Sequence, residues 1–245
     1  MLTLITGGTR GIGAATAVRL AQADHDLVLG FREDVPAAEE CRRRVQEAGA
    51  RCTLVRADLT EADGVSRLFD GAAEVGRLTG VVNNAGATFH LGSLAETPVE
   101  VVRRTVELNL TAALLVARSA VRTMGASYGG RGGVLVNVGS VAARLGAPGE
   151  YVHYAAAKAG VESFTRGLAQ EVAGDGVRVV AVAPGVVRTR IHADAGDATR
   201  PERVGAAVPL GRPGEPDEVA EAVAWLMSEQ AGYVTGTTLE LAGGR

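Results

Sequence analysis

Short apolar runs alternate with longer amphipathic stretches along the whole chain. The apolar runs are continuous in Val, Leu and Ile, which is typical of parallel strands that are covered on both faces. They predict seven strands, over Leu2–Thr6, Asp26–Phe31, Arg51–Arg56, Gly80–Asn83, Gly133–Val138, Val177–Ala183 and Thr238–Leu241. The stretches between them predict helices over Gly13–Ala23, Pro36–Ala48, Thr60–Val75, Val99–Met124, Tyr151–Ala173 and Glu215–Met227. This alternation predicts an α/β fold, a doubly wound parallel sheet of the Rossmann type with helices on both faces.

No linker, internal repeat or low-complexity tract interrupts this pattern, so we expect one domain over residues 1–245. Two segments depart from the alternation. Gly125–Gly132 is a glycine-rich turn, and Arg188–Pro213 is a long connection after the sixth predicted strand. Long connections in compact domains are often lids or binding loops, so we expect residues 188–213 to border a substrate.

Charge and cysteine content exclude several classes of protein. The net charge of −3 argues against nucleic acid as the main partner, because a phosphate backbone calls for a basic surface. Cys41 and Cys52 lack metal-type spacing, so we expect no metal site and favour two free thiols over a structural disulfide. The start, Met1–Ile5, enters an apolar run at once, and no run is long enough to span a bilayer. We therefore expect a cytoplasmic protein without a signal peptide or a membrane partner.

The first predicted strand runs into the sequence Thr-Gly-Gly-Thr-Arg-Gly-Ile-Gly, residues 6–13, and then into a helix. Glycines in such a turn let the backbone approach a pyrophosphate at a helix N-terminus, where free N–H groups favour anions. A plain strand-to-helix turn is the alternative interpretation. The position after the first strand favours a dinucleotide, with contacts from Gly7, Thr9, Arg10, Gly11, Ile12 and Gly13.

The second predicted strand ends at Phe31, where dinucleotide folds often place an acidic residue for the ribose 2′-hydroxyl. Here Arg32 follows, and Arg10 lies in the glycine turn. Two arginines near the adenosine ribose suit a 2′-phosphate and therefore NADP(H). Both could also be ordinary surface arginines, and the nearby Glu33 and Asp34 keep NAD(H) as the alternative.

Asp58, followed by Leu59, comes after the third predicted strand. Its carboxylate could accept a hydrogen bond from an adenine amino group. It could equally cap the N-terminus of the next helix, a role for which Thr60 competes.

Among the 25 basic residues, Lys158 alone is a lysine, and it lies four residues after Tyr154. Guanidinium is a planar fork of donors, whereas ammonium is a compact charge on a flexible stem. A site that needs a point charge close to a phenol and a ribose could not easily use arginine. The pair is therefore a candidate for proton chemistry, with a chance spacing as the alternative.

Further polar motifs follow the other predicted strands. Residues 83–86, Asn-Asn-Ala-Gly, close the fourth strand, Ser140 closes the fifth, and Pro184–Thr189 closes the sixth, while Asn109 lies in a helix. With the glycine turn and the tyrosine–lysine pair, these motifs resemble the short-chain dehydrogenase/reductase family over essentially the whole chain. Within that family the chain is most similar to the β-ketoacyl-carrier-protein reductases and the sugar or steroid dehydrogenases.

The resemblance implies an NADP(H)-dependent oxidoreductase that interconverts a carbonyl and a secondary alcohol, with Tyr154 as general acid or base. Lys158 would lower the phenol pKa and bind the nicotinamide ribose, and Ser140 would bind the substrate oxygen. Asn109 would hold a helix kink and a water that links Lys158 to solvent. Further cofactor contacts would come from Asn84, Ala85, Gly86, Pro184, Gly185, Val187 and Thr189.

Ser140 and Tyr154 are fourteen residues apart, one more than is usual in the family. We expect the extra residue to bulge the loop Ala142–Glu150, which the resemblance places beside the substrate. Tyr151 is a rival phenol, but the residue four positions later is Ala155, so we interpret Tyr151 as a wall of the substrate pocket.

The substrate class stays open at this point. An acidic carrier protein calls for basic residues at the pocket mouth, where Arg131 is expected, but Asp175 occupies a second such position. The polar loop Ile191–Val204 favours a hydroxylated or charged small substrate. We expect His192 on the surface and His153 facing either pocket or solvent, and we interpret His25 and His90 as structural.

Four alternatives remain beside the NADP(H)-dependent reductase. They are an NAD(H)-dependent sugar or polyol dehydrogenase, a β-ketoacyl-carrier-protein reductase, a non-catalytic NADP(H)-sensing protein, and an epimerase or dehydratase. The intact set of Asn109, Ser140, Tyr154 and Lys158 argues against the sensor. The resemblance also implies a homotetramer, or a homodimer, built through the two long central helices and through the C-terminal helix and last strand.

Overall fold

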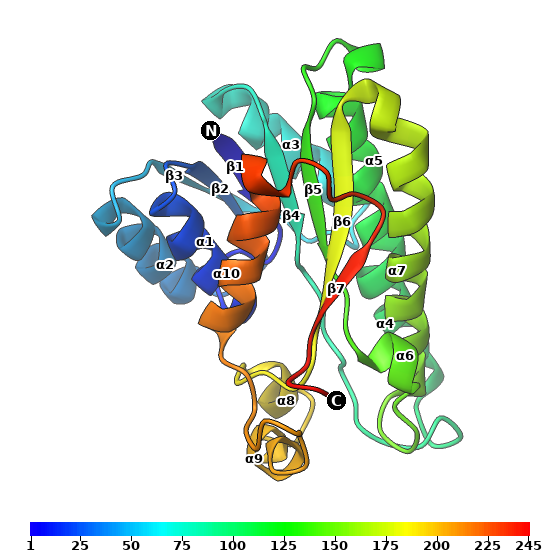
Figure 1. Ribbon diagram of the computed structural model, residues 1–245. Coiled ribbons are helices and arrows are strands. Elements are labelled where there is room, and N and C mark those ends of the chain that lie inside the picture. The colour runs from blue at the N-terminus through cyan, green and yellow to red at the C-terminus, as the bar shows by residue number, and fades with distance from the viewer.

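The computed structural model describes residues 1–245 and contains seven parallel strands in one sheet (Figure 1). The strands follow the order β3-β2-β1-β4-β5-β6-β7. They are β1 (Leu2–Ile5), β2 (Asp26–Phe31), β3 (Cys52–Arg56), β4 (Gly80–Asn83), β5 (Gly133–Val138), β6 (Val177–Pro184) and β7 (Thr238–Leu241). Every predicted strand is present to within one residue at each end, and the predicted Rossmann-type sheet is confirmed.

Alternate residues of each central strand point to opposite faces of the sheet, and each face has its own core. Ile5 and Leu29 pack under α1 (Gly11–Ala21), α2 (Val35–Glu47) and α10 (Pro216–Met227). Leu4 and Val28 pack on the other face, under α3 (Gly64–Val75), α5 (Ala112–Met124) and α7 (Val152–Val172). Both faces are buried, which explains why the strands are continuous in aliphatic residues.

Two predicted helices differ from the structure by more than two residues. The stretch Val99–Met124 is not one α-helix but α4 (Val99–Val106), a π-helical turn over Glu107–Thr111, and α5. The helix predicted from Thr60 begins at Gly64, because Asp58 Oδ1 accepts hydrogen bonds from the backbone N (2.9 Å) and Oγ1 (2.7 Å) of Thr60 and forms a turn. Neither Asp58 nor Thr60 therefore caps α3.

The two loops expected near the substrate both contain short helices. The Ala142–Glu150 loop begins with α6 (Ala142–Leu145), and the 188–213 segment contains α8 (Ile191–Asp194) and α9 (Arg200–Gly205). Figure 1 shows α8 and α9 beyond the carboxyl ends of the strands, next to the C-terminus. No helix combines the length and apolar composition that crossing a membrane requires.

Candidate active site

A cleft of about 1350 Å³ opens at the carboxyl ends of the strands. The strand order reverses between β1 and β4, which is where doubly wound sheets bind their ligands. The cleft brings together most of the predicted site residues, namely Gly7, Thr9, Arg10, Gly11, Ile12, Arg32, Asp58, Leu59, Asn84, Ala85, Gly86, Ser140, Tyr154, Lys158, Pro184, Gly185, Val187 and Thr189. Of the predicted set, Gly13 and Asn109 lie outside the lining.

The glycine turn is fixed to the end of β4 by side-chain hydrogen bonds. Thr6 Oγ1 accepts from the backbone N of Asn84 and of Ala85, each at 2.9 Å. The Asn84 amide in turn donates to the carbonyls of Thr6 (2.9 Å) and Gly7 (3.0 Å). The glycine turn after β1 and the loop after β4 face each other where the strand order reverses. These hydrogen bonds hold the two loops together as one rigid unit.

The start of α1 fits an anionic group. Gly7 and Gly11 have φ of +58° and +51°, and a Cβ at Gly13 would lie 2.2 Å from the Gly7 carbonyl oxygen. Gly13 thus lets the turn lie against the helix, which accounts for its place outside the lining. The first N–H groups of a helix have no partner within the helix. Free donors and a glycine cradle together fit the pyrophosphate of a dinucleotide.

Three arginines surround the carboxyl end of β2. Arg10 and Arg190 lie 3.5 Å and 3.8 Å from Asp34 Oδ2, and Arg32 Nε lies 2.9 Å from Glu33 Oε1. All three arginines line the cleft. Sequence reasoning missed Arg190, although it directly follows Thr189 in the motif that closes β6.

Asp58 keeps its charge despite partial enclosure. Burial favours the neutral carboxyl, but the hydrogen bonds from Thr60 and the nearby Arg32 and Arg104 outweigh it and hold the pKa of Asp58 below its ordinary value. Its Oδ1 is occupied by Thr60, and Oδ2 accepts no hydrogen bond within the protein. The carboxylate can therefore accept from a ligand.

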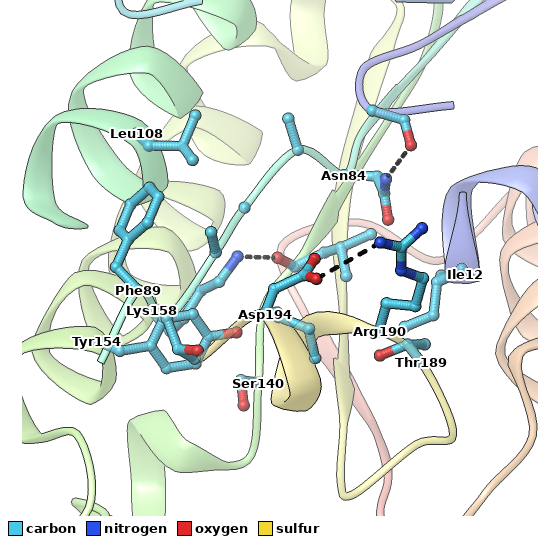
Figure 2. Close-up of a pocket in the computed structure, with 18 of the residues that line it drawn as sticks. Ile12, Asn84, Phe89, Leu108, Ser140, Tyr154, Lys158, Thr189, Arg190 and Asp194 are labelled. Carbon is cyan, nitrogen blue, oxygen red and sulfur yellow. Dashed lines mark hydrogen bonds and ion pairs between the residues drawn. The ribbon is translucent and has the colours of Figure 1, made fainter. Parts of the chain in front are cut away.

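Lys158 is buried in α7, and its Nζ donates to the carbonyl of Val138 at 2.8 Å. The same Nζ lies 5.6 Å from the centroid of the Tyr154 ring. Burial lowers the pKa of Lys158 to about 8, because no carboxylate compensates the ammonium. Figure 2 shows Ser140, Tyr154 and Lys158 on one side of the pocket, opposite Asn84, Ile12 and Thr189.

Tyr154 is a buried phenol beside a second one. Its ring meets the Tyr151 ring edge to face, with the centroids 5.4 Å apart. Burial raises the pKa of Tyr154, Tyr151 adds to the rise, and the Ser140 hydroxyl opposes it. Without further positive charge the phenol therefore stays protonated at neutral pH and can donate its proton.

Asn109 lies in the π-helical turn and is fully buried. Its Nδ2 donates to the carbonyls of Ala87 (2.8 Å) and Thr105 (2.9 Å), and its Oδ1 accepts from the Ala87 backbone N at 3.2 Å. A Cβ at Gly86 would lie 2.7 Å from Asn109 Oδ1 and 3.3 Å from Lys158 Nζ. Asn109 therefore sits behind the loop that borders Lys158, at the expected irregularity of the helix.

A buried polar network, absent from the sequence predictions, supports the site. Asn83 Nδ2 donates to Asn137 Oδ1 at 3.0 Å, and Asn137 Nδ2 donates to Thr165 Oγ1 at 2.9 Å. It links β4 and β5 to α7, the helix that carries Tyr154 and Lys158. The signal was an asparagine inside each of two otherwise aliphatic strands, because buried polar groups need partners.

The side of the cleft that the sequence predicts to border the substrate has an unusual backbone. Gly146, Ala147 and Gly149 all have positive φ, of 73°, 48° and 72°, within the loop that has the extra residue. Ala147 is nevertheless buried against the two tyrosines. The loop therefore adopts left-handed backbone at three positions after α6.

Three residue predictions on this side are wrong. His192 is not on the surface: only 8% of it is exposed, and it lines the cleft, because α8 folds back over the opening. His153 is buried and lines no part of the cleft, so it faces neither pocket nor solvent. Arg131 precedes β5 at the opposite end of the strand from the cleft, so it does not lie at this chain's pocket mouth.

The sequence assigned no individual role to two further residues of the lining, the second of which lies in the polar loop Ile191–Val204. Phe89 has a φ of +61°, which is rare for a non-glycine residue, and the Arg104 guanidinium lies 4.2 Å from its ring centroid. Arg200 is the second, a buried arginine from α9. Neither position belongs to a motif. No group of His, Cys, Asp and Glu side chains is arranged to hold a metal ion.

A doubly wound sheet with this glycine turn and tyrosine–lysine pair is the arrangement that the sequence predicted for a short-chain dehydrogenase/reductase. Residues 7–245 match the family described as enoyl-(acyl carrier protein) reductase. The chain belongs to the short-chain dehydrogenase/reductase family. It is an oxidoreductase that acts on CH–OH and C=O groups, and the family binds nicotinamide cofactors.

Similar proteins cover the whole chain. An uncharacterized oxidoreductase, YgfF, of Escherichia coli K12 is 40% identical over 245 residues, covering 100% of this chain and 99% of that protein. A cis-4-hydroxycyclohexanecarboxylate dehydrogenase of Sinomonas cyclohexanicum is 40% identical, covering 99% of this chain and 95% of its own. The structure of a 3-ketoacyl-(acyl-carrier-protein) reductase of Brucella melitensis with NADH has a TM-score of 0.90 and 30% identity, covering 100% of this chain and 97% of its own.

Proposed function

We propose that this protein catalyses the NADP(H)-dependent interconversion of a small ketone and its secondary alcohol, with Tyr154 exchanging the proton. One observation supports this most strongly. The chain's single lysine is buried with its ammonium 5.6 Å from the Tyr154 ring, in the same cleft as the glycine turn. A buried ammonium is costly to keep, so its position favours a functional role.

The residues of the site divide the proton work. In the reducing direction, Tyr154 Oη donates its proton to the carbonyl oxygen, and Ser140 Oγ hydrogen-bonds the same oxygen. Lys158 stabilises the phenolate that remains, since a nearby cation favours the charged form. Asn109 fixes the loop at Ala87, behind Lys158. A water at this place would return a proton to the phenolate by way of Lys158. A bound nicotinamide would supply the hydride, or accept it in the oxidising direction. Acid–base help of this kind is worth about 10²–10⁴-fold.

The cofactor would extend along the whole cleft. The N–H groups at the start of α1, with Gly7, Thr9, Gly11 and Ile12, would hold the pyrophosphate. Asp58 and Leu59 would contact the adenine. Asn84, Ala85 and Gly86 would lie along the nucleosides, and Lys158 would bind the nicotinamide ribose. At the far end, Pro184, Gly185, Val187 and Thr189 would fix the carboxamide.

The preference for NADP(H) is supported by Arg10, Arg32 and Arg190 around the end of β2. Glu33 and Asp34 pair with these arginines and favour NAD(H) as the second candidate. We expect Arg32→Ala to lower kcat/KM for NADPH by about tenfold and to leave NADH nearly unchanged, because one charge-assisted contact to the phosphate is lost. Arg42→Ala on α2, outside the cleft, is the control. An unchanged cofactor preference in Arg32→Ala would favour NAD(H).

The reaction itself is tested by a panel of ketones and alcohols with NADPH and NADP⁺, read at 340 nm. Ring ketones and ring alcohols come first, because the Sinomonas relative is named for a ring alcohol. A β-ketoacyl thioester on acyl carrier protein belongs on the panel, although Arg131 no longer supports it. Tight NADPH binding without turnover of any member would instead favour the sensing protein.

We also propose a cytoplasmic homotetramer in which residues 188–213 form the substrate loop. Both cysteines are free, which fits a reducing compartment. Exposed apolar side chains lie on the elements expected at the two interfaces: Leu114 and Leu115 on α5, Trp225 on α10, and Tyr233 before β7. Sedimentation equilibrium should give four times the monomer mass. A monomer at micromolar concentration would contradict the assembly.

A further inference from the structure

Arg200 is the first residue of α9, and only 3% of it is exposed. Its Nη2 donates to Glu150 Oε2 and to the Tyr151 hydroxyl, each at 2.5 Å. The guanidinium carbon lies 5.0 Å from the centroid of the Tyr151 ring. A residue of the substrate loop thus reaches into the floor of the cleft and contacts the loop that follows α6.

The guanidinium has donors that the protein does not use. Both hydrogens of Nη2 are occupied, but Nε is buried without a partner, and Nη1 makes no hydrogen bond. An unmade hydrogen bond at a buried donor costs about 1–3 kcal/mol, and more for a charged group. Nε is enclosed by the protein, so Nη1 is the free donor that a ligand in the cleft can reach.

Arg200 is close to the proposed proton donor. The Tyr154 and Tyr151 ring centroids are 5.4 Å apart, and the Arg200 guanidinium lies 5.0 Å from the Tyr151 ring centroid. Tyr151 therefore packs against both Tyr154 and the guanidinium. A single small molecule can place a reacting carbon at Tyr154 and an acceptor group at Arg200.

The charges at this end favour an anion. Lys158 and Arg200 are both buried cations, and Glu150 is the one carboxylate in contact with them. His192 adds no charge at neutral pH, because burial and the nearby Arg200 lower its pKa to about 4. Asp194 also lines the cleft, where its carboxylate lies 3.9 Å from the Arg190 guanidinium. Each of these carboxylates is thus paired with an arginine, and the buried Lys158 ammonium has no carboxylate partner.

The position of Arg200 is set before any ligand arrives. Asp197 Oδ1 accepts from the backbone N (3.1 Å) and Oγ1 (2.8 Å) of Thr199, and Asp197 Oδ2 accepts from Arg203 at 2.5 Å. These bonds order the turn that leads into α9. A preorganised group loses less entropy on binding, which is what a recognition residue requires.

We propose that Arg200 recognises a carboxylate on the substrate, so that the enzyme acts on small oxo acids and hydroxy acids. The substrate carboxylate accepts a hydrogen bond from Nη1, while Glu150 and Tyr151 keep Nη2. The inference rests on the proposed function for the reacting end, at Tyr154, and adds the chemical class of the other end.

The test measures binding and not turnover, so the two proposals can fail separately. Calorimetry with NADPH-saturated Tyr154→Phe protein compares 4-oxopentanoate with its methyl ester, and 3-oxocyclohexanecarboxylate with its methyl ester. We expect at least one acid to bind about tenfold more tightly than its ester, because a charge-assisted hydrogen bond is replaced by a neutral one. Adding Arg200→Gln should remove this preference and leave ester affinity within about threefold.

Arg103→Gln is the control, since Arg103 is an exposed arginine on α4 that pairs with Glu100 and lies outside the cleft. It should retain the preference for the acid. Arg200→Gln leaves Glu150 without its partner, so Arg200→Gln/Glu150→Gln is measured in parallel and should behave in the same way. Arg200→Lys, which keeps the charge, should restore part of the preference.

Equal affinity for acid and ester, no binding of either acid, or an acid preference that survives in the double variant would overturn the inference. Absence of ketone turnover in the wild-type protein would instead contradict the proposed function, and the binding comparison would still stand.

Discussion

The two ends of the cleft are held in place by different kinds of interaction. At the cofactor end, backbone groups and short polar side chains do the work: Thr6 and Asn84 fix the glycine turn, and Gly13 lets helix and turn touch. At the substrate end, left-handed residues and ion pairs between long side chains hold the loops, with Arg200 on Glu150 as the central contact.

This difference indicates which end of the cleft is constrained in proteins of this family and which end can differ from one protein to another. A cradle made of backbone and glycine leaves little freedom for substitution, because an added Cβ collides with main-chain atoms. A pocket made of ion pairs between loops can change its partners without moving the sheet. The substrate end is therefore where a protein of this family can acquire its own specificity.

The largest expected effect lies where the two ends meet, at Lys158. Lys158→Arg keeps the charge, but the longer planar fork cannot replace an ammonium that donates to the Val138 carbonyl from a buried position. We expect kcat/KM to fall by about 10²-fold or more. Near-normal steady-state kinetics in this variant would mean that the lone lysine has no catalytic role.

The second effect is a pH dependence of stability that comes from the same side chain. Burial lowers the pKa of Lys158 from 10.5 to about 8. Below pH 8 both folded and unfolded chains carry the ammonium, and the folded chain bears the cost of burying it. Between pH 8 and 10.5 the unfolded chain binds the proton that the folded chain has released, so stability rises with pH.

The free energy of unfolding of the wild type, relative to Lys158→Met, should therefore increase by up to about 3 kcal/mol across this pH range. Urea titrations of both proteins at several pH values measure it. A difference that stays flat with pH would show that Lys158 titrates normally.

The third and smallest effect compares one substitution at the two ends. In Gly13→Ala the new Cβ would lie 2.2 Å from a main-chain oxygen, so we expect a loss of about 1–3 kcal/mol in unfolding free energy and weaker cofactor binding. In Gly149→Ala nothing lies within 4 Å of the new Cβ, and only the φ of +72° opposes it. There we expect about 1 kcal/mol and unchanged cofactor binding. Equal effects at both sites would remove the contrast between the ends.

The sequence predicted the strands and the cofactor end of the cleft better than it predicted the substrate end. A strand that is buried on both faces needs aliphatic side chains at almost every position. The ends of the strands were therefore predictable to within one residue. The motif residues at the ends of β1, β4, β5 and β6 converge because parallel strands bring their carboxyl ends to one edge. The start of α3 was missed because the turn at Asp58 and Thr60 competes locally with helix formation.

The substrate end was predicted poorly, for a physical reason. His192 and Arg200 are buried only because α8 and α9 fold over the cleft, and no periodicity in a polar loop reports that contact. Arg131 was expected at the pocket because of its place along the chain. It lies before the amino end of β5, whereas the cleft lies at the carboxyl ends of the strands. Packing between segments that are distant in sequence determines where these side chains lie. At the cofactor end, short sequence motifs determine the positions of the residues.

Tyr154, and not its neighbour Tyr151, is the residue that we propose exchanges the proton. The two rings touch edge to face, so the matched pair Tyr154→Phe and Tyr151→Phe changes one hydroxyl in nearly the same environment. The most direct measurement is kcat for each variant on the best substrate of the panel. We predict a loss of about 10²–10⁴-fold for Tyr154→Phe and less than about tenfold for Tyr151→Phe. Abolished turnover in Tyr151→Phe with an active Tyr154→Phe would contradict the account.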